Sequence, residues 1–184
     1  MRASFVVPCL AGVLALGACA GNPYGYARTY SPLGEEDDYF DAASMVTYED
    51  VRRTPRNYEQ TTVGWFGVVT AVDPAVLESR PRQAHVTLSH RIHQERHLCG
   101  DERAASCRVT VSDRSVGDFH VTLAIPETDL EGDERIQVGS LVKVYGTPDT
   151  TVAGGGNPTI RVRYYRHWPR GTFATAADRE RLRR

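Results

Sequence analysis

The sequence contains no run of about 20 consecutive apolar residues, the length that an α-helix needs to cross a bilayer. It contains no Gly-x-Ser-x-Gly motif and no paired C-x-x-C motifs, which would indicate a serine hydrolase or a structural zinc site. Basic residues are not in excess, since 22 Lys and Arg residues stand against 23 Asp and Glu residues. These absences argue against a multi-span membrane protein, a serine hydrolase of that type and a nucleic-acid partner.

Lysine is also nearly absent, because Lys143 is the only lysine and all other basic residues are arginines. We interpret this imbalance as a coding bias that favours arginine codons. The arginine content alone therefore does not indicate a selected chemistry.

The N-terminus has the pattern of a lipoprotein signal peptide over residues 1–18. An apolar stretch, Phe5–Leu16, is followed by Leu16-Gly17-Ala18-Cys19, which resembles the lipobox cut before a diacylated cysteine. We expect Cys19 to become the lipid-modified N-terminus. The alternative is cleavage by the ordinary signal peptidase at the small-x-small site Ala18-Cys19-Ala20, which would release a soluble protein that lacks Cys19. Because no aspartate follows Cys19, we expect an outer-membrane lipoprotein with its domain in the periplasm.

The mature chain is expected to have three further parts. Residues 19–45 carry Gly, Pro, Tyr and an acidic run without an apolar period, and they predict a lipid-anchored flexible linker. Residues 46–170 predict one folded domain, and residues 171–184 a basic tail. That tail is either a membrane-surface or polyanion contact or a frayed, solvated terminus.

Within the domain, alternation of apolar and polar residues predicts five or six short strands. A short helix begins at an N-cap, Thr47, and Pro126–Asp133 has room for one helical turn between the third and fourth barrel strands. We expect an all-β domain folded as an OB-like Greek-key barrel, and the same strand count also fits a β-sandwich. In the strands, these residues are expected to face the core: Val86, Leu88, Ile92, Ile160, Val162 and Tyr164.

Cys99 and Cys107 are the thiols that remain after processing and lipidation, and an oxidising compartment favours a disulfide between them. A metal site is the alternative, with His90, His93 and His97 as the nearby ligands. The histidine spacing does not favour it, because His90 and His93 fall on opposite faces of a strand. We therefore expect a disulfide, no metal and no cofactor.

A possible binding surface lies on the last strand. Outward-facing arginine and aromatic side chains form ligand sites on OB barrels, and such a stripe is expected here at Arg161, Arg163, Tyr165 and Arg166. Its partner would be an anionic envelope glycan, a lipid headgroup or an envelope protein. The alternative is a protective charged surface on an edge strand.

Three segments resemble the Slp family of Gram-negative outer-membrane lipoproteins: Tyr48–Tyr58, Val63–Val69 and Val162–Pro169. With Val138–Thr147, which is similar to the penultimate strand of that family, the resemblance spans residues 46–169. It implies a non-enzymatic protein linked to stress at the envelope. Two other functions stay open: a metal-binding or enzymatic lipoprotein using the His/Cys loop, and an accessory subunit of an envelope assembly.

Overall fold

The structure is a computed structural model, and it describes residues 26–27, 30, 32–74, 83–98, 108–151 and 156–177. Residues 1–18, Cys19, Cys99, Cys107 and residues 178–184 lie outside this part of the chain. Nothing in the structure therefore bears on the signal peptide, the lipid anchor, the disulfide or the end of the tail.

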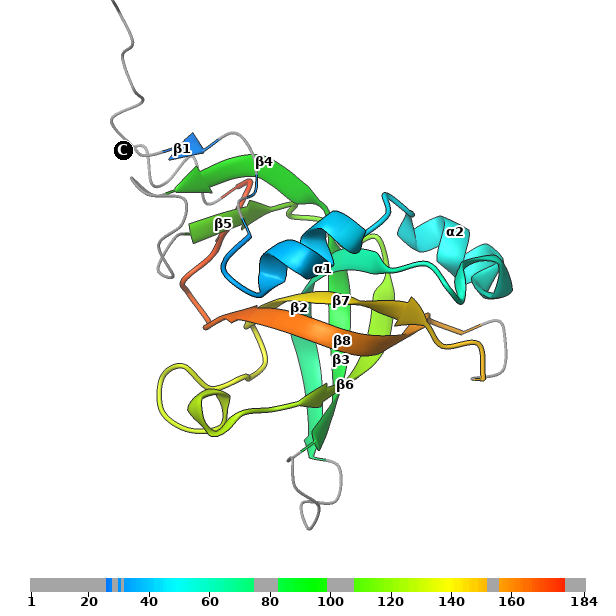
Figure 1. The fold of residues 1–184 in the computed structure, drawn as a ribbon. Coiled ribbons are helices and arrows are strands. Elements are labelled where there is room, and N and C mark those ends of the chain that lie inside the picture. The colour runs from blue at the N-terminus through cyan, green and yellow to red at the C-terminus, as the bar shows by residue number, and fades with distance from the viewer. Residues whose placement is uncertain are drawn as a thin grey trace, which may run out of the picture.

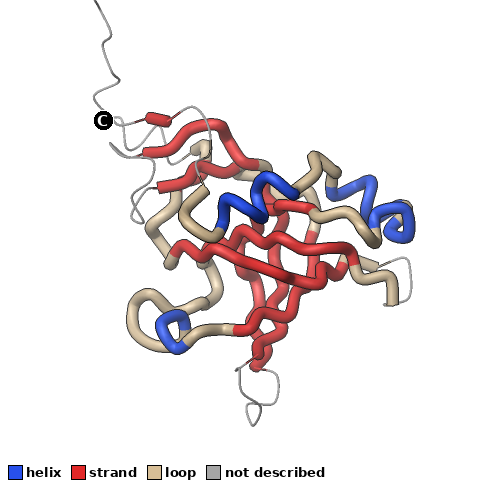
Figure 2. Tube along the Cα trace, viewed as in Figure 1, coloured by secondary structure: helices blue, strands red, loops and turns tan. Residues whose placement is uncertain are grey.

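The described residues are mostly β, with short helices (Figures 1 and 2). The helical segments are α1 (Glu36–Ala42), α2 (Tyr48–Arg53), and the 3-10 turns η1 (Pro55–Tyr58) and η2 (Glu127–Asp129). The strands are β1 (Tyr26–Ala27), β2 (Val63–Pro74), β3 (Gln83–Arg91), β4 (His93–Leu98), β5 (Arg108–Val111), β6 (Asp118–Ala124), β7 (Leu141–Pro148), β8 (Thr159–Trp168) and β9 (Ala174–Thr175).

Five strands close into a barrel in the order β2-β3-β6-β8-β7. All neighbours are antiparallel except β6 and β8, which are parallel, and η2 lies between β6 and β7. The all-β OB-like barrel that the sequence predicts is confirmed, and the β-sandwich alternative is not observed. Closure is possible because β2 is long enough to pair with β7 along its first half and with β3 along its second half.

The glycines of β2 are required by close packing. A Cβ added at Gly67 would lie 2.7 Å from Cβ of Leu88 and 2.9 Å from the Phe119 ring, inside the barrel. A Cβ at Gly64 would lie 3.0 Å from the Tyr145 ring on the outer side. Around these positions the barrel interior is filled by fully buried side chains such as Leu88 and Phe119. Burial of each contributes roughly 1.5–3 kcal/mol relative to exposure.

Two predicted strand faces are wrong. Ile92 is 55% exposed, because β3 ends at Arg91 and Ile92 is the single residue between β3 and β4. In β8 the register shifts, so that Tyr145 pairs with Tyr164 while Gly146 pairs with Val162. The extra residue, Arg163, reverses the alternation. Tyr165 therefore packs against the barrel core beside Val162, and Tyr164 faces outward.

A second, smaller sheet has the order β1-β4-β5-β9 and was not predicted as a separate layer. The β4–β5 hairpin extends from the end of β3, and Figure 1 shows it above one end of the barrel. Phe66, Leu141 and Trp168 of the barrel pack against Val109 and Val111 beneath this sheet. The part of the predicted tail at Ala174–Thr175 is a strand, because it pairs in parallel with β5.

The flexible linker expected over residues 19–45 is wrong wherever the structure describes it, because Tyr26–Ala27 pair with β4, Tyr30 bonds to Glu36 and residues 36–42 form α1. Helix α1 lies over the outer face of the barrel strands (Figure 1), where Glu36 is completely buried and bonded to β7 and β8. Tyr39 stacks on Tyr164 at a ring distance of 4.9 Å. The acidic composition suggested a solvated segment, but Glu36 has its counter-charges on the barrel.

The helix predicted to begin at Thr47 is confirmed as α2. The side chain of Thr47 accepts a hydrogen bond of 3.2 Å from the Asp50 backbone N–H, and so caps the helix. Of the helices in the described ranges, none has the length and apolar character needed to cross a membrane.

Candidate functional site

A groove of about 660 Å³ lies where the helical segment meets the barrel. One wall is residues 43–49, which comprise the segment between α1 and α2 and the first two residues of α2. The other wall is residues 90–93 with Val116. Gly64–Phe66 of β2 line it between these walls, together with Lys143 and Tyr145 of β7. The volume falls within the roughly 300–1,000 Å³ that is usual for small-molecule sites.

The exposed apolar side chains of the protein gather at this groove. Among the described residues, five large apolar side chains are exposed, and only Val138 lies elsewhere. The other four, which all line the groove, are Phe40, Met45, Ile92 and Val116. Apolar side chains exposed together, rather than singly, mark an interaction surface.

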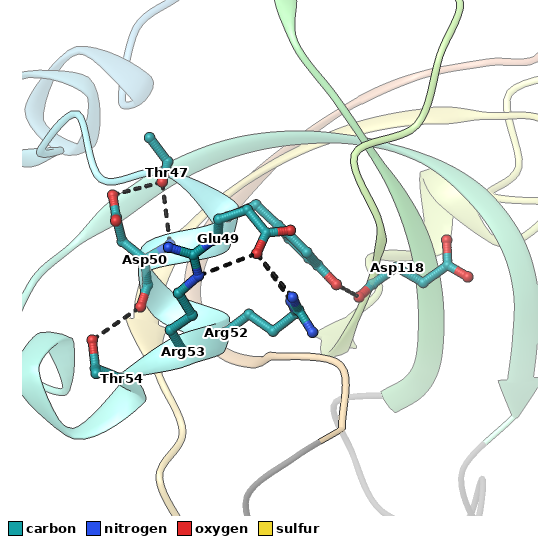
Figure 3. Close-up of polar contacts among 8 residues, drawn as sticks. Thr47, Glu49, Asp50, Arg52, Arg53, Thr54 and Asp118 are labelled. Carbon is teal, nitrogen blue, oxygen red and sulfur yellow. Dashed lines mark hydrogen bonds and ion pairs between the residues drawn. The ribbon is translucent and has the colours of Figure 1, made fainter.

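Helix α2 holds one wall in place. The Tyr48 hydroxyl donates a 2.8 Å hydrogen bond to the Asp118 carbonyl of β6, and Glu49 pairs with Arg52 at 3.0 Å (Figure 3). The indole N–H of Trp65 donates to the Val46 carbonyl at 3.0 Å, which fixes the connecting segment over the barrel. The wall is thus bonded to both β2 and β6.

His90 is the polar group beside Trp65 in the groove lining. Its ring lies 5.2 Å from the Trp65 ring and 5.5 Å from the Tyr48 ring, measured between centroids. Burial lowers its pKa to about 4, so the imidazole is neutral at pH 7. Its Nδ1 atom is buried and has no hydrogen-bond partner within the described part of the chain. The ring therefore contributes to the groove lining through its contacts with Trp65 and Tyr48.

A second aromatic cluster surrounds the Lys143 ammonium. The Nζ atom lies 3.6 Å from the centroid of the Tyr30 ring, and between 4.7 and 4.9 Å from three other ring centroids, those of Phe40, Phe66 and Tyr145. The aromatic faces attract the cation, while removal from water disfavours it. Burial lowers the pKa of Lys143 to about 7, although the nearby Glu36 carboxylate acts in the opposite direction.

Glu36 joins α1 to this cluster. Its carboxylate accepts hydrogen bonds from the Tyr145 hydroxyl at 2.8 Å, the Leu33 backbone N–H at 3.1 Å, Arg166 at 3.1 Å and the Tyr30 hydroxyl. Burial, with the Glu36 charge, raises the pKa of both tyrosines above their usual range. They therefore remain neutral donors to the carboxylate.

The predicted arginine stripe is not one surface. Arg161 is exposed and pairs with Asp149 at 3.4 Å, whereas the side chain of Arg166 is mostly buried and bonds to Glu36. The Tyr165 hydroxyl donates to Asp129 at 3.0 Å. Arg163, Tyr165 and Arg166 all line a separate cleft of about 540 Å³ between β8 and the end of β6. Of the four predicted residues, only Arg161 does not line this cleft.

The histidines of the alternative metal site are also separated. His93 stacks on Phe66 at a ring distance of 5.3 Å on the second-sheet side, whereas His90 faces Trp65 and Phe119 of the barrel. The side chain of His97 lies outside the described residues, as do Cys99 and Cys107. Across the described ranges, no group of three metal-ligating side chains converges.

Sequence reasoning missed the residues that define this site. Glu36 was assigned to a solvated acidic run, and Lys143 was attributed to coding bias. One signal was present: Lys143 is the only lysine, and it lies in Leu141–Tyr145, a segment that is otherwise apolar or aromatic. A charge in the middle of such a strand requires a partner.

No protein-family model matches this chain, and a search of curated proteins finds no relative.

Proposed function

We propose that this protein is a non-enzymatic, lipid-anchored outer-membrane protein of the Slp type, and that its groove binds an apolar component of the envelope. The observation that carries the proposal is the gathering of Phe40, Met45, Ile92 and Val116 around one groove. Burial of such side chains against a ligand contributes about 25 cal/mol for each Å² of apolar surface removed from water.

Packing within the free protein already holds the lining of the groove in place. Trp65 and Tyr48 are almost fully buried, and each is tied by a hydrogen bond to a different segment. A lining that is held in this way loses little conformational freedom when a ligand enters. This supports a binding role for the groove.

The expected anchor places the groove near the membrane. Tyr30, which lines the groove, follows Cys19 by 11 residues. A fully extended chain covers at most about 3.6 Å per residue, so the groove lies within about 40 Å of a lipid on Cys19. Envelope lipids and membrane-bound proteins are the apolar molecules within that reach.

Photocrosslinking in intact cells tests the proposal. A photoreactive amino acid at Met45, whose side chain is fully exposed on the groove, should form an adduct with an envelope component. The same amino acid at Val138, an exposed apolar position outside the groove, is the control. If Met45 gives no more adduct than Val138, the groove is not a binding site.

A further inference from the structure

The groove carries a surplus of positive charge beside its apolar lining. Glu36 already has a close counter-ion in Arg166, at 3.1 Å. Lys143 lies further from the same carboxylate, with Nζ 4.0 Å from Oε1, and unlike Glu36 it lines the groove. When Lys143 is protonated, two cations therefore share one anion. An anionic group on a ligand would complement this arrangement.

Backbone N–H groups on both walls of the groove already donate hydrogen bonds within the protein. The Val46 N–H donates to the Ser44 carbonyl at 2.8 Å, and the Val116 N–H donates to the His90 carbonyl at 3.1 Å. The Ile92 N–H donates to the Ser112 hydroxyl at 3.0 Å. An extended peptide that adds to a sheet edge needs such groups for its own backbone. A hydrocarbon chain carries no hydrogen-bonding groups, so it is the occupant that this lining suits.

We propose that the groove binds a long-chain fatty acid, with the hydrocarbon chain against Trp65, Met45 and Ile92 and the carboxylate beside the Lys143 ammonium. This inference rests on the proposed function, because it requires the groove to be a binding site. It adds the chemical class of the ligand and the residue that recognises its charge.

Binding of a carboxylate should be linked to protonation of Lys143. The lysine has a pKa of about 7 in the free protein, and a bound anion favours its charged form. Affinity for the fatty acid should therefore fall as the pH rises from 7 to 9. The groups that face Lys143 are Glu36 on α1, Arg166 on β8, Tyr145 on β7 and Tyr30. The other charged or titratable groups that line the same groove are Tyr48, Glu49, His90, Arg91 and His93.

The test compares hexadecanoic acid with the uncharged hexadecanol of equal chain length, by titration of the purified protein with each compound. The wild-type protein should bind the acid about tenfold more tightly than the alcohol at pH 7, and Lys143→Met should bind the two equally. Ile92→Asp should weaken both. Val138→Asp, which changes an equally exposed apolar residue outside the groove, should weaken neither.

The inference is overturned if the wild-type protein does not prefer the acid, or if Lys143→Met retains the preference. If the Lys143→Met variant does not fold, the pH series on the wild-type protein decides the question. The preference of the wild-type protein for the acid over the alcohol must then decline between pH 7 and 9. If Met45 crosslinks to an envelope protein instead of a lipid, the fatty-acid inference fails and the proposed function stands. If Met45 crosslinks to nothing, the proposed function itself fails.

Discussion

The carboxylate of Glu36 lies 4.0 Å from the ammonium of Lys143, and both side chains are buried between α1 and the outer face of the barrel. Arg166 and Tyr145 bond to the same carboxylate from β8 and β7. Glu36 therefore connects the N-terminal helix to two barrel strands at once, and it holds one of the segments that border the groove.

Glu36→Gln should destabilise the protein by about 3 kcal/mol, because it leaves Lys143 and Arg166 buried without their carboxylate. Chemical denaturation measures this loss. Glu49→Gln is the matched control: it breaks a surface pair with Arg52 and should cost less than about 1 kcal/mol. Equal losses in the two variants would show that burial of Glu36 does not matter.

The stability of the wild-type protein relative to Lys143→Met should increase with pH between about 7 and 10. In the unfolded chain Lys143 has its ordinary pKa of 10.5, whereas burial in the folded state lowers the pKa to about 7. The unfolded state therefore binds more protons over this window, and raising the pH favours folding. The gain is at most about 1.4 kcal/mol per pH unit. A constant difference across the window would contradict the lowered pKa.

His90 should make the protein sensitive to acid. Its pKa is lowered from 6.5 to about 4 by burial, so the unfolded chain takes up a proton below pH 6.5 that the folded protein does not. Relative to His90→Leu, the wild-type protein should lose stability as the pH falls from 6.5 to 4. Thermal unfolding across this range measures the difference. Parallel curves for the two proteins would argue against a neutral, buried imidazole.

The disulfide between Cys99 and Cys107 stays a prediction. Both residues lie outside the described part of the chain, where they directly follow and precede Leu98 and Arg108, the last described pair of the β4–β5 ladder. Mass spectrometry of the purified protein should find no free thiol at these positions. Replacing both cysteines with serine should cost up to about 3 kcal/mol and leave the barrel folded. Reduced thiols with one bound zinc per chain would favour the alternative metal site instead.

Lipidation of Cys19 is equally open to a direct test. Cells grown with radiolabelled palmitate should label the wild-type protein, whereas Cys19→Ser should take up no label and should retain its signal peptide. A soluble, unlabelled wild-type protein in the periplasm would show that the ordinary signal peptidase cuts the chain.

Local patterns in the sequence predicted the elements that depend on local interactions. The cap at Thr47 predicted α2, because an N-cap acts on backbone groups within the next turn. Alternation predicted the buried positions of Val86 and Leu88 in β3, where pairing is regular. It failed at Ile92, where the strand ends, and at Tyr165, where the single extra residue Arg163 reverses the faces. Alternation does not reveal a bulge, since the partner strand sets the register.

The sequence by itself determined where most of the barrel strands lie along the chain, since apolar alternation and turn residues operate over a few neighbouring positions. It did not determine the site. The roles of Glu36 and Lys143 depend on α1 lying across β7, because a charge is stable in the protein interior only when the fold brings a partner to it. The groove also exists only where the α1–α2 segment and the β3–β4 turn meet, and these segments are far apart in sequence. Tertiary structure alone decided which apolar side chains stay exposed together.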